Sequence, residues 1–339
     1  MRSSFAHSLA RTLASLLLIA AASAAHADAP SLDIDNLSTF KGARKIVVDQ
    51  FGVEFVTTLK ARGSGGGSSA NMDAKLEGVS DAAMQALADR AYQDTVAALT
   101  QAGFEVVSSD ELQAHPLYKE LMGKVAHDSP YVVDDKGAYS RIFAPTGMKA
   151  VFRSGKDLRG SIGDRMDAFN SKYQGDFSEV AKGLGVYLVR FHYLASFGTA
   201  TASKGFLANM TGKARAGIEA GPVLMAKSTM VQVISHEGPR IFANSPRGAN
   251  ATVCLDAPLA VKADGYALEE TTTAESKRSD GVANALSVGL NLLTGGRGAS
   301  QQSNKTMAVT LTEENFSESY LRMIGQARDA FVAQLVAAR

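Results

Sequence analysis

The sequence predicts an α/β fold, in which a mixed β-sheet is flanked by helices, extended by glycine-rich β-hairpins and closed by a C-terminal helix. Two observations predict it. Segments rich in β-branched residues are interleaved with segments of helical periodicity, in the order strand, helix, strand, helix, strand, hairpin and terminal helix. The 339 residues are also 45% hydrophobic, enough to bury a large core.

The N-terminus has the three parts of a secretory signal peptide. Arg2 and Arg11 supply positive charge, residues 13–22 form an apolar run, and small residues up to Ala27 form an A-x-A cleavage site. The run is shorter than the roughly 20 residues that span a bilayer. We therefore expect residues 1–27 to be removed and residues 28–339 to form a single exported domain. Because no Cys follows the cleavage site, we do not expect a lipoprotein.

The first elements of the mature chain are predicted from local patterns. Residues 45–56 are rich in Val, Ile and Phe and predict a strand with a bulge at Gly52. Residues 63–69 have the Gly/Ser composition of a flexible connector. A long helix is expected between the N-cap Ser80 and Gly103, followed by a short strand. Its apolar stripe is Met84, Leu87, Ala91, Val96 and Leu99.

The middle of the chain has weaker patterns. Residues 116–124 predict a short helix, and residues 125–175 are rich in Gly, Asp and Lys without clear periodicity. We interpret residues 113–175 as an insertion or extended surface region, which divides the core of the domain into residues 41–112 and 176–339.

Regular patterns return after this region. Asp176 is expected to cap a short helix that ends at Gly185, and residues 186–194 alternate as a strand. A strand over residues 223–234 is expected to form a hairpin through a turn at Glu237-Gly238-Pro239. Thr312 is expected to cap the terminal helix. The apolar stripe of that helix is Phe316, Tyr320, Met323, Ile324, Ala327, Phe331 and Leu335.

Two glycine-rich segments have the pattern of one-sided β-hairpins. Apolar residues alternate with Ser, Gly and Asn over residues 286–292, a Gly-Gly-Arg-Gly turn follows, and the alternation returns over residues 307–311. Strands with one apolar face are what a transmembrane β-barrel requires. Two alternatives stay open: such strands also pack on ordinary cores, and residues 282–293 fit a helix as well. The candidate membrane or partner hairpin consists of Leu286, Val288, Leu290, Leu292, Met307, Val309 and Leu311. A second hairpin is expected from residues 204–221.

Charge and cysteine usage exclude some classes of function. The 35 basic and 34 acidic residues are nearly balanced, so we expect no nucleic-acid partner. Cys254 is the only cysteine, so no intramolecular disulfide can form, and its apolar surroundings predict a buried strand position.

Several motifs that could carry chemistry are incomplete. The Gly/Ser segment at residues 63–69 lacks the Lys-Ser or Lys-Thr of a phosphate loop, and Ser38-x-x-Lys41 lacks the companion motifs of penicillin-recognising enzymes. The four histidines of the mature chain do not have the spacing of a zinc site. They are His115, His127, His192 and His236. We expect His192 to be structural or at the surface and His236 to lie in a hairpin turn, and we predict no catalytic residue, cofactor or metal.

The order of these elements resembles a known superfamily. The strand at residues 45–56, the helix ending Val-Ala-Ala-Leu-Thr-Gln-Ala-Gly and the strand after it are similar to the N-terminal part of the curli-secretion channel (CsgG) and Tol-protein N-terminal-like superfamily. The helix–Gly–strand step at residues 179–189, the glycine-rich hairpins and the terminal helix follow in the same order. The resemblance implies a non-catalytic domain that works by assembly. The chain departs from it in lacking the lipid-bearing Cys and in residues 113–175.

The sequence therefore predicts a non-enzymatic assembly or secretion factor of the cell envelope. It would act by forming homo-oligomers or by binding other envelope proteins, with outer-membrane contact through the candidate hairpin. The alternative is a periplasmic ligand-binding protein or enzyme, with a site assembled from scattered residues near 125–175. The candidates for such a site are Asp134, Asp135, Arg141 and Lys149.

Overall fold

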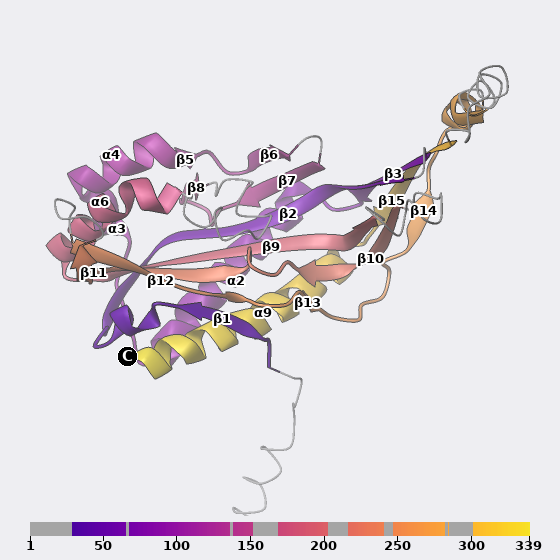
Figure 1. The fold of residues 1–339 in the computed structure, drawn as a ribbon. Coiled ribbons are helices and arrows are strands. Elements are labelled where there is room, and N and C mark those ends of the chain that lie inside the picture. The colour runs from indigo at the N-terminus through magenta and orange to yellow at the C-terminus, as the bar shows by residue number, and fades with distance from the viewer. Residues whose placement is uncertain are drawn as a thin grey trace, which may run out of the picture.

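The computed structural model describes residues 29–65, 68–135, 138–151, 169–202, 216–240, 247–281, 284 and 301–339. Residues 1–28, which contain the expected signal peptide, lie outside them. One large mixed sheet carries helices on both faces (Figure 1). The predicted α/β class is confirmed.

The sheet contains both parallel and antiparallel pairs of strands. Its main path runs β1 (Leu32–Asp35), β12 (Arg247–Leu255), β11 (Met230–Arg240), β9 (Tyr187–Ala202), β2 (Lys45–Gly65), β3 (Ser68–Glu77), β15 (Gln301–Thr310), β14 (Leu268–Glu270). The pairs β2–β9 and β3–β15 are parallel, and the other pairs on this path are antiparallel. Additional strands flank the path: β4 (Glu105–Val106), β6 (Tyr131–Asp135), β7 (Ala138–Phe143), β10 (Ala216–Leu224) and β13 (Leu259–Ala260). The strands β5 (Ala126–His127) and β8 (Ala150–Val151) form a separate two-stranded sheet.

The two long helices pack together on one face of the sheet, which we call the α2 face. They are α2 (Asp81–Gln101) and α9 (Glu313–Ala338). Both begin as predicted, because the Ser80 side chain accepts a hydrogen bond from the Ala83 amide and the Thr312 side chain accepts one from the Asn315 amide. The predicted apolar stripe of α9 is buried in the main core, where Phe55 of β2 contacts the ring of Phe316.

Shorter helices cover the opposite face at one end, which we call the α4 face. They are α3 (Asp110–Ala114), α4 (Pro116–Val125) and α6 (Phe169–Leu184). A second apolar cluster, which includes Leu121, Phe177 and Leu188, lies between them and the sheet. The short 3-10 helix η1 (Leu37–Phe40) leads into β2. The prediction that Asp176 caps α6 is wrong, because the helix begins at Phe169; Gly185, with φ of 64°, follows its end as expected.

The predicted connector at residues 63–69 is the end of a long hairpin. β2 continues to Gly65, which pairs with Ser68 at the start of β3. β3 is paired on its other edge with β15 over its whole length. Residues 63–65 are paired with β3, and residues 68 and 69 are paired on both edges. This pairing, and not composition, sets their extended conformation.

Part of the predicted insertion belongs to the main sheet. β7 pairs with β2 over residues 53–58, and β6 pairs with β7. The Phe143 side chain is buried in the main core, and α4 contacts α6. The expectation of an extended surface region is therefore wrong for the end of β7, where Ile142 and Phe143 are buried.

The strand predicted at residues 223–234 is two strands. β10 ends at Leu224 and β11 begins at Met230, and Lys227 between them has φ of 62°. The turn predicted at residues 237–239 is wrong, because β11 continues through them to Arg240, which pairs with Arg247 of β12. Cys254 lies on β12 and is buried, as predicted.

Candidate functional site

The predicted membrane or partner hairpin is described only in its second half. Leu286, Val288, Leu290 and Leu292 lie outside the described residues. Val309 and Leu311 are buried in the main core, and Met307 packs against it. β15 is held between β3 and β14, so the apolar alternation of this strand is satisfied inside the described domain.

The alternative site residues do not converge. Arg141 on β7 forms an ion pair with Asp81 at the start of α2, through Nη2 and Oδ2 at 2.6 Å. Lys149 forms an ion pair with Asp128. Asp134 lies on β6, and the side chain of Asp135 is not described. Of these four residues, only Lys149 reaches the pocket described below.

A buried ion pair on the α4 face joins the two central parallel strands. The β2–β9 register shifts between Val48 and Gln50, so Asp49 is an extra, bulged residue. Its carboxylate accepts hydrogen bonds from Arg190 of β9, from Nε at 2.9 and 3.0 Å and from Nη2 at 2.8 Å. Both side chains are fully buried, and the guanidinium lies 4.1 Å from the centre of the Phe177 ring.

A second polar cluster lies further along the same face. Glu54 of β2 accepts a hydrogen bond from the Ser140 hydroxyl through Oε1, and its Oε2 lies 3.2 Å from His192 Nε2. All three side chains are buried. The sequence predicts His192 to be either structural or at the surface. Its side chain is buried, so the structural position is the one observed. A histidine that activates a serine accepts a hydrogen bond from the serine hydroxyl. Here the Ser140 hydroxyl donates to Glu54 instead, and His192 also contacts Glu54, so this is not the geometry of an activated serine.

A pocket opens on the α4 face above the ion pair; we call it the α4 pocket. Its volume is about 680 Å³, within the range of small-molecule sites. Asp49 and Tyr118 lie at its buried base, where the Tyr118 hydroxyl donates to the Asp49 carbonyl at 3.0 Å. One wall comes from α3 and α4 with Ser109, Gln113, Lys119, Met122 and Gly123, and the other includes His127, Asp128, Met148 and Lys149.

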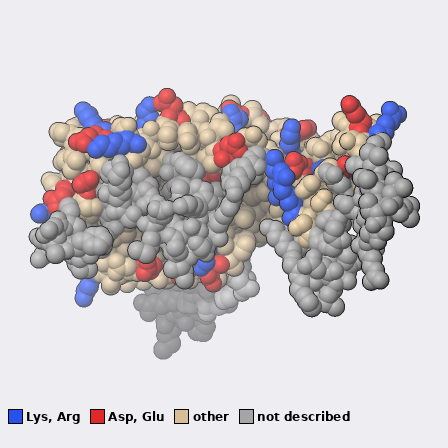
Figure 2. Space-filling model, turned by 45° about the horizontal axis from the view of Figure 1, so that its top comes forward, with Lys and Arg blue, Asp and Glu red and all other residues tan. Residues whose placement is uncertain are grey.

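The pocket combines fixed charges with an apolar lining. Lys149 donates a hydrogen bond to Asp128 and lowers the pKa of that carboxyl group. Burial and the nearby Asp49 raise the pKa of Tyr118 well above its ordinary value, so its hydroxyl stays protonated at alkaline pH as well as at neutral pH. The His127 ring stacks on Tyr131, with the ring centres 3.9 Å apart. On the face drawn in Figure 2, the described basic and acidic side chains are interspersed.

The other predicted positions are consistent with structural roles or are not described. His115 is the N-cap residue of α4, and the side chain of His236 is not described although its backbone lies in β11. No group of three or more His, Cys, Asp and Glu side chains suited to a metal ion occurs within the described ranges. The chemistry available in the α4 pocket is that of binding, through hydrogen bonds, charge and apolar contact.

Sequence reasoning missed Asp49, Glu54 and Tyr118. The signal was present for the first two, because each is an acid inside an otherwise apolar strand segment, where a charge needs a partner. Tyr118 carried no such signal, since a tyrosine on a short helix is usually part of a core.

None of the helices in the described part of the chain is long and apolar enough to cross a membrane. Comparison with known proteins finds no matching protein family, no similar curated protein and no similar solved structure at a significant level.

Proposed function

We propose that this chain is an exported, non-enzymatic envelope protein that acts by assembling with copies of itself or with partner proteins. Two β-hairpins would make these contacts. The first arm is the β2–β3 hairpin beyond residue 57 together with β15, and the second arm is the β9–β10 hairpin beyond Ala195. Both extend toward the same end of the molecule, and β3 and β15 reach past the end of α9 (Figure 1).

An exposed sheet edge on the second arm carries the proposal. β10 pairs with β9 on one side, and among the described strands its other side is paired only at Val223 and Leu224, with β13. On this side, the residues of β10 that precede Val223 therefore offer their backbone N–H and C=O groups to a further strand. The inner side of β10 is fixed, since Ile218 is buried in the main core. A rigid strand with an open edge is suited to pairing with another chain.

The order of elements favours the same proposal, because it resembles that of the curli-secretion channel superfamily, whose members work by assembly. We extend the proposal to periplasmic location and to contact with the outer membrane through the glycine-rich hairpins.

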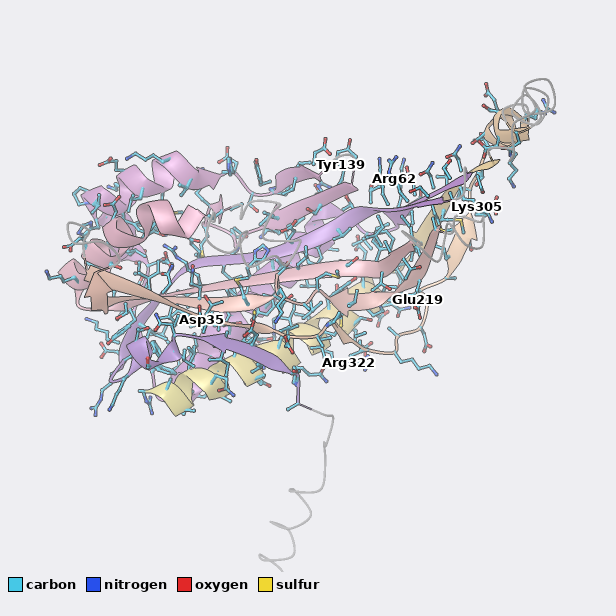
Figure 3. The ribbon with its side chains drawn as sticks, in the orientation of Figure 1. Asp35, Arg62, Tyr139, Glu219, Lys305 and Arg322 are labelled. Carbon is cyan, nitrogen blue, oxygen red and sulfur yellow. The ribbon has the colours of Figure 1, made fainter. Side chains whose placement is uncertain are left out.

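Cross-linking at the β10 edge tests the assembly. Glu219 is exposed on β10 (Figure 3), and Glu318 is exposed on α9, where a helix offers no strand edge. Glu219→Cys is therefore compared with Glu318→Cys, both in a Cys254→Ala background. We expect Glu219→Cys to give cross-linked species and Glu318→Cys to remain uncross-linked.

The cellular location of the protein is tested separately. Fractionation and N-terminal sequencing of the full chain should give an envelope protein that begins at Asp28. A protein that stays soluble and monomeric would contradict the proposal.

A small-molecule-binding function is the second candidate, favoured by the α4 pocket. The pocket is large enough for a metabolite-sized ligand and has a rigid base, because the Asp49–Arg190 ion pair and the Tyr118 hydrogen bond fix it. Stabilisation of the purified protein by a small molecule in a thermal-shift screen would support it.

A further inference from the structure

Gly123 in the wall of the α4 pocket has no evident structural cause. It lies in the last turn of α4, and it is not among the described glycines with positive φ. A Cβ atom at this position would have no heavy atom within 4 Å, so crowding does not require glycine either. Glycine within a helix costs roughly 0.5–1 kcal/mol relative to alanine. The effect of Gly123 is to keep space open in the pocket that it lines.

The charges of the pocket do not cancel. Asp49 is neutralised by the buried Arg190, and Asp128 is neutralised by Lys149. Lys119, by contrast, is exposed on α4 and forms no ion pair with an acid of the described chain. One uncompensated positive charge therefore lies on the same wall as the hydroxyl of Ser109 and the amide of Gln113. This wall favours a negatively charged group.

The remaining lining is apolar and adaptable. Met122 and Met148 lie on opposite walls, with the Tyr118 ring at the base. Both methionines are only partly exposed. Thioether side chains adjust their shape to irregular apolar ligands. A ligand that filled this space would place an apolar body between the two methionines and an acidic group at the α4 wall.

We propose that the α4 pocket binds an organic anion with an apolar body, such as a medium-chain carboxylate, with its acidic group at Lys119 and its apolar part over Gly123. This inference rests on the second candidate function, that of a small-molecule-binding protein, and it is independent of assembly through β10. It names the ligand class, which that function leaves open.

Calorimetric titration of the full mature chain with three eight-carbon probes tests the ligand class. The probes are octanoate, octanol and octyltrimethylammonium, each below the concentration at which it forms micelles. We expect octanoate to bind at one site, at least tenfold more tightly than either of the other two. Equal or tighter binding of octanol or of the cation would overturn the anion assignment but leave a small-molecule site in place.

Two substitutions locate the site. Lys119→Gln should weaken octanoate binding about tenfold, whereas Lys124→Gln, the same change on the same helix outside the pocket lining, should leave it unchanged. Gly123→Leu should abolish binding of octanoate while the protein stays folded, because leucine favours the helix more than glycine does. Gly123→Ala should have a smaller effect in the same direction.

Three results would overturn the proposal. Equal effects of Lys119→Gln and Lys124→Gln would show that Lys119 does not hold the acid, and undiminished binding by folded Gly123→Leu would place the ligand elsewhere. No saturable binding of any of the three probes would contradict the ligand class, whereas the thermal-shift screen decides separately whether the pocket binds a small molecule of another class.

Discussion

Asp49 and Arg190 are 141 residues apart in the sequence and form a buried ion pair between two strands that run parallel at the centre of the sheet. The pair exists because a bulge in β2 places Asp49 opposite the guanidinium group. Removing two charges from water is costly, and the bonds within such a pair often do no more than offset that cost. The main effect of the pair is therefore on register, since it fixes which residues of β2 and β9 lie side by side. Its net contribution to stability is small.

Loss of one partner should be far more damaging than loss of an exposed ion pair. Asp49→Asn removes the carboxylate that forms the ion pair with the buried guanidinium of Arg190, and we expect the free energy of unfolding to fall by about 3–5 kcal/mol. Urea denaturation followed by circular dichroism measures the change. Asp128→Asn, which breaks the exposed pair with Lys149, serves as the control and should leave the urea midpoint near that of the wild type. Equal losses in the two variants would contradict this account of the buried pair.

Stability should decrease above about pH 10 because several phenols are buried. Burial raises the pKa of Tyr118, Tyr193 and Tyr320 above the ordinary value, and raises that of Tyr266 to about 12. Each hydroxyl is neutral in the folded chain at a pH where the unfolded chain has lost the proton, since an unperturbed phenol titrates near pH 10. The stabilising effect is fully present below that pH and is lost as the pH rises toward the pKa of the folded state, by up to about 1.4 kcal/mol per pH unit for each phenol.

The urea midpoint between pH 8 and pH 11.5, with phenolate absorbance recorded in parallel, measures this dependence. Tyr193→Phe removes one of the buried hydroxyls and keeps the ring, so its midpoint should fall less steeply with pH than that of the wild type. A parallel decline in the two proteins would show that other groups, such as lysines, cause the alkaline loss.

Local signals predicted the helices and their caps better than the long strands. The α2 and α9 stripes follow directly from periodicity, and Ser80 and Thr312 cap as their side chains predict. The prediction of a flexible connector is wrong for residues 63–65, 68 and 69, because their strand conformation depends on distant partners. Asn71 of β3 donates to Asn304 of β15 at 2.8 Å, across 233 residues of sequence.

The same limit applies to the candidate site. The charge of Asp49 within an apolar strand could be read from the sequence, but its partner Arg190 follows only from the parallel register of β2 and β9. The α4 pocket is even less accessible to sequence reasoning, since its walls come from α3, α4 and the segment around Lys149. Such a concave site depends on tertiary packing, which composition and periodicity do not encode.

The stability of the β9–β10 arm should depend on Gly198 of β9, where the backbone of β10 comes very close. A Cβ atom at Gly198 would lie 2.5 Å from the backbone carbonyl oxygen of Glu219, whereas one at Gly221 would have no heavy atom within 4 Å. Gly198→Ala therefore forces the two strands apart, and we expect it to lower the free energy of unfolding by about 1–3 kcal/mol. Gly221→Ala is the matched control on β10 and should be near neutral. Thermal denaturation compares them, and equal melting temperatures would show that the arm adjusts without cost.

The N-termini of α2 and α9 are linked, and their caps should contribute similarly to stability. The Ser80 amide donates to Glu313 Oε1 at 3.1 Å, while the Ser80 and Thr312 side chains each accept from an amide of their own helix at 3.2 Å. Ser80→Ala and Thr312→Ala leave those amides without their acceptor, and each should cost about 1 kcal/mol in urea denaturation. Ser80→Gly should cost only a few tenths of a kcal/mol, because glycine at an N-cap leaves the helix amides open to water. If Ser80→Gly were as damaging as Ser80→Ala, the side-chain cap would not be the cause, and packing of α2 against α9 would have to explain the loss.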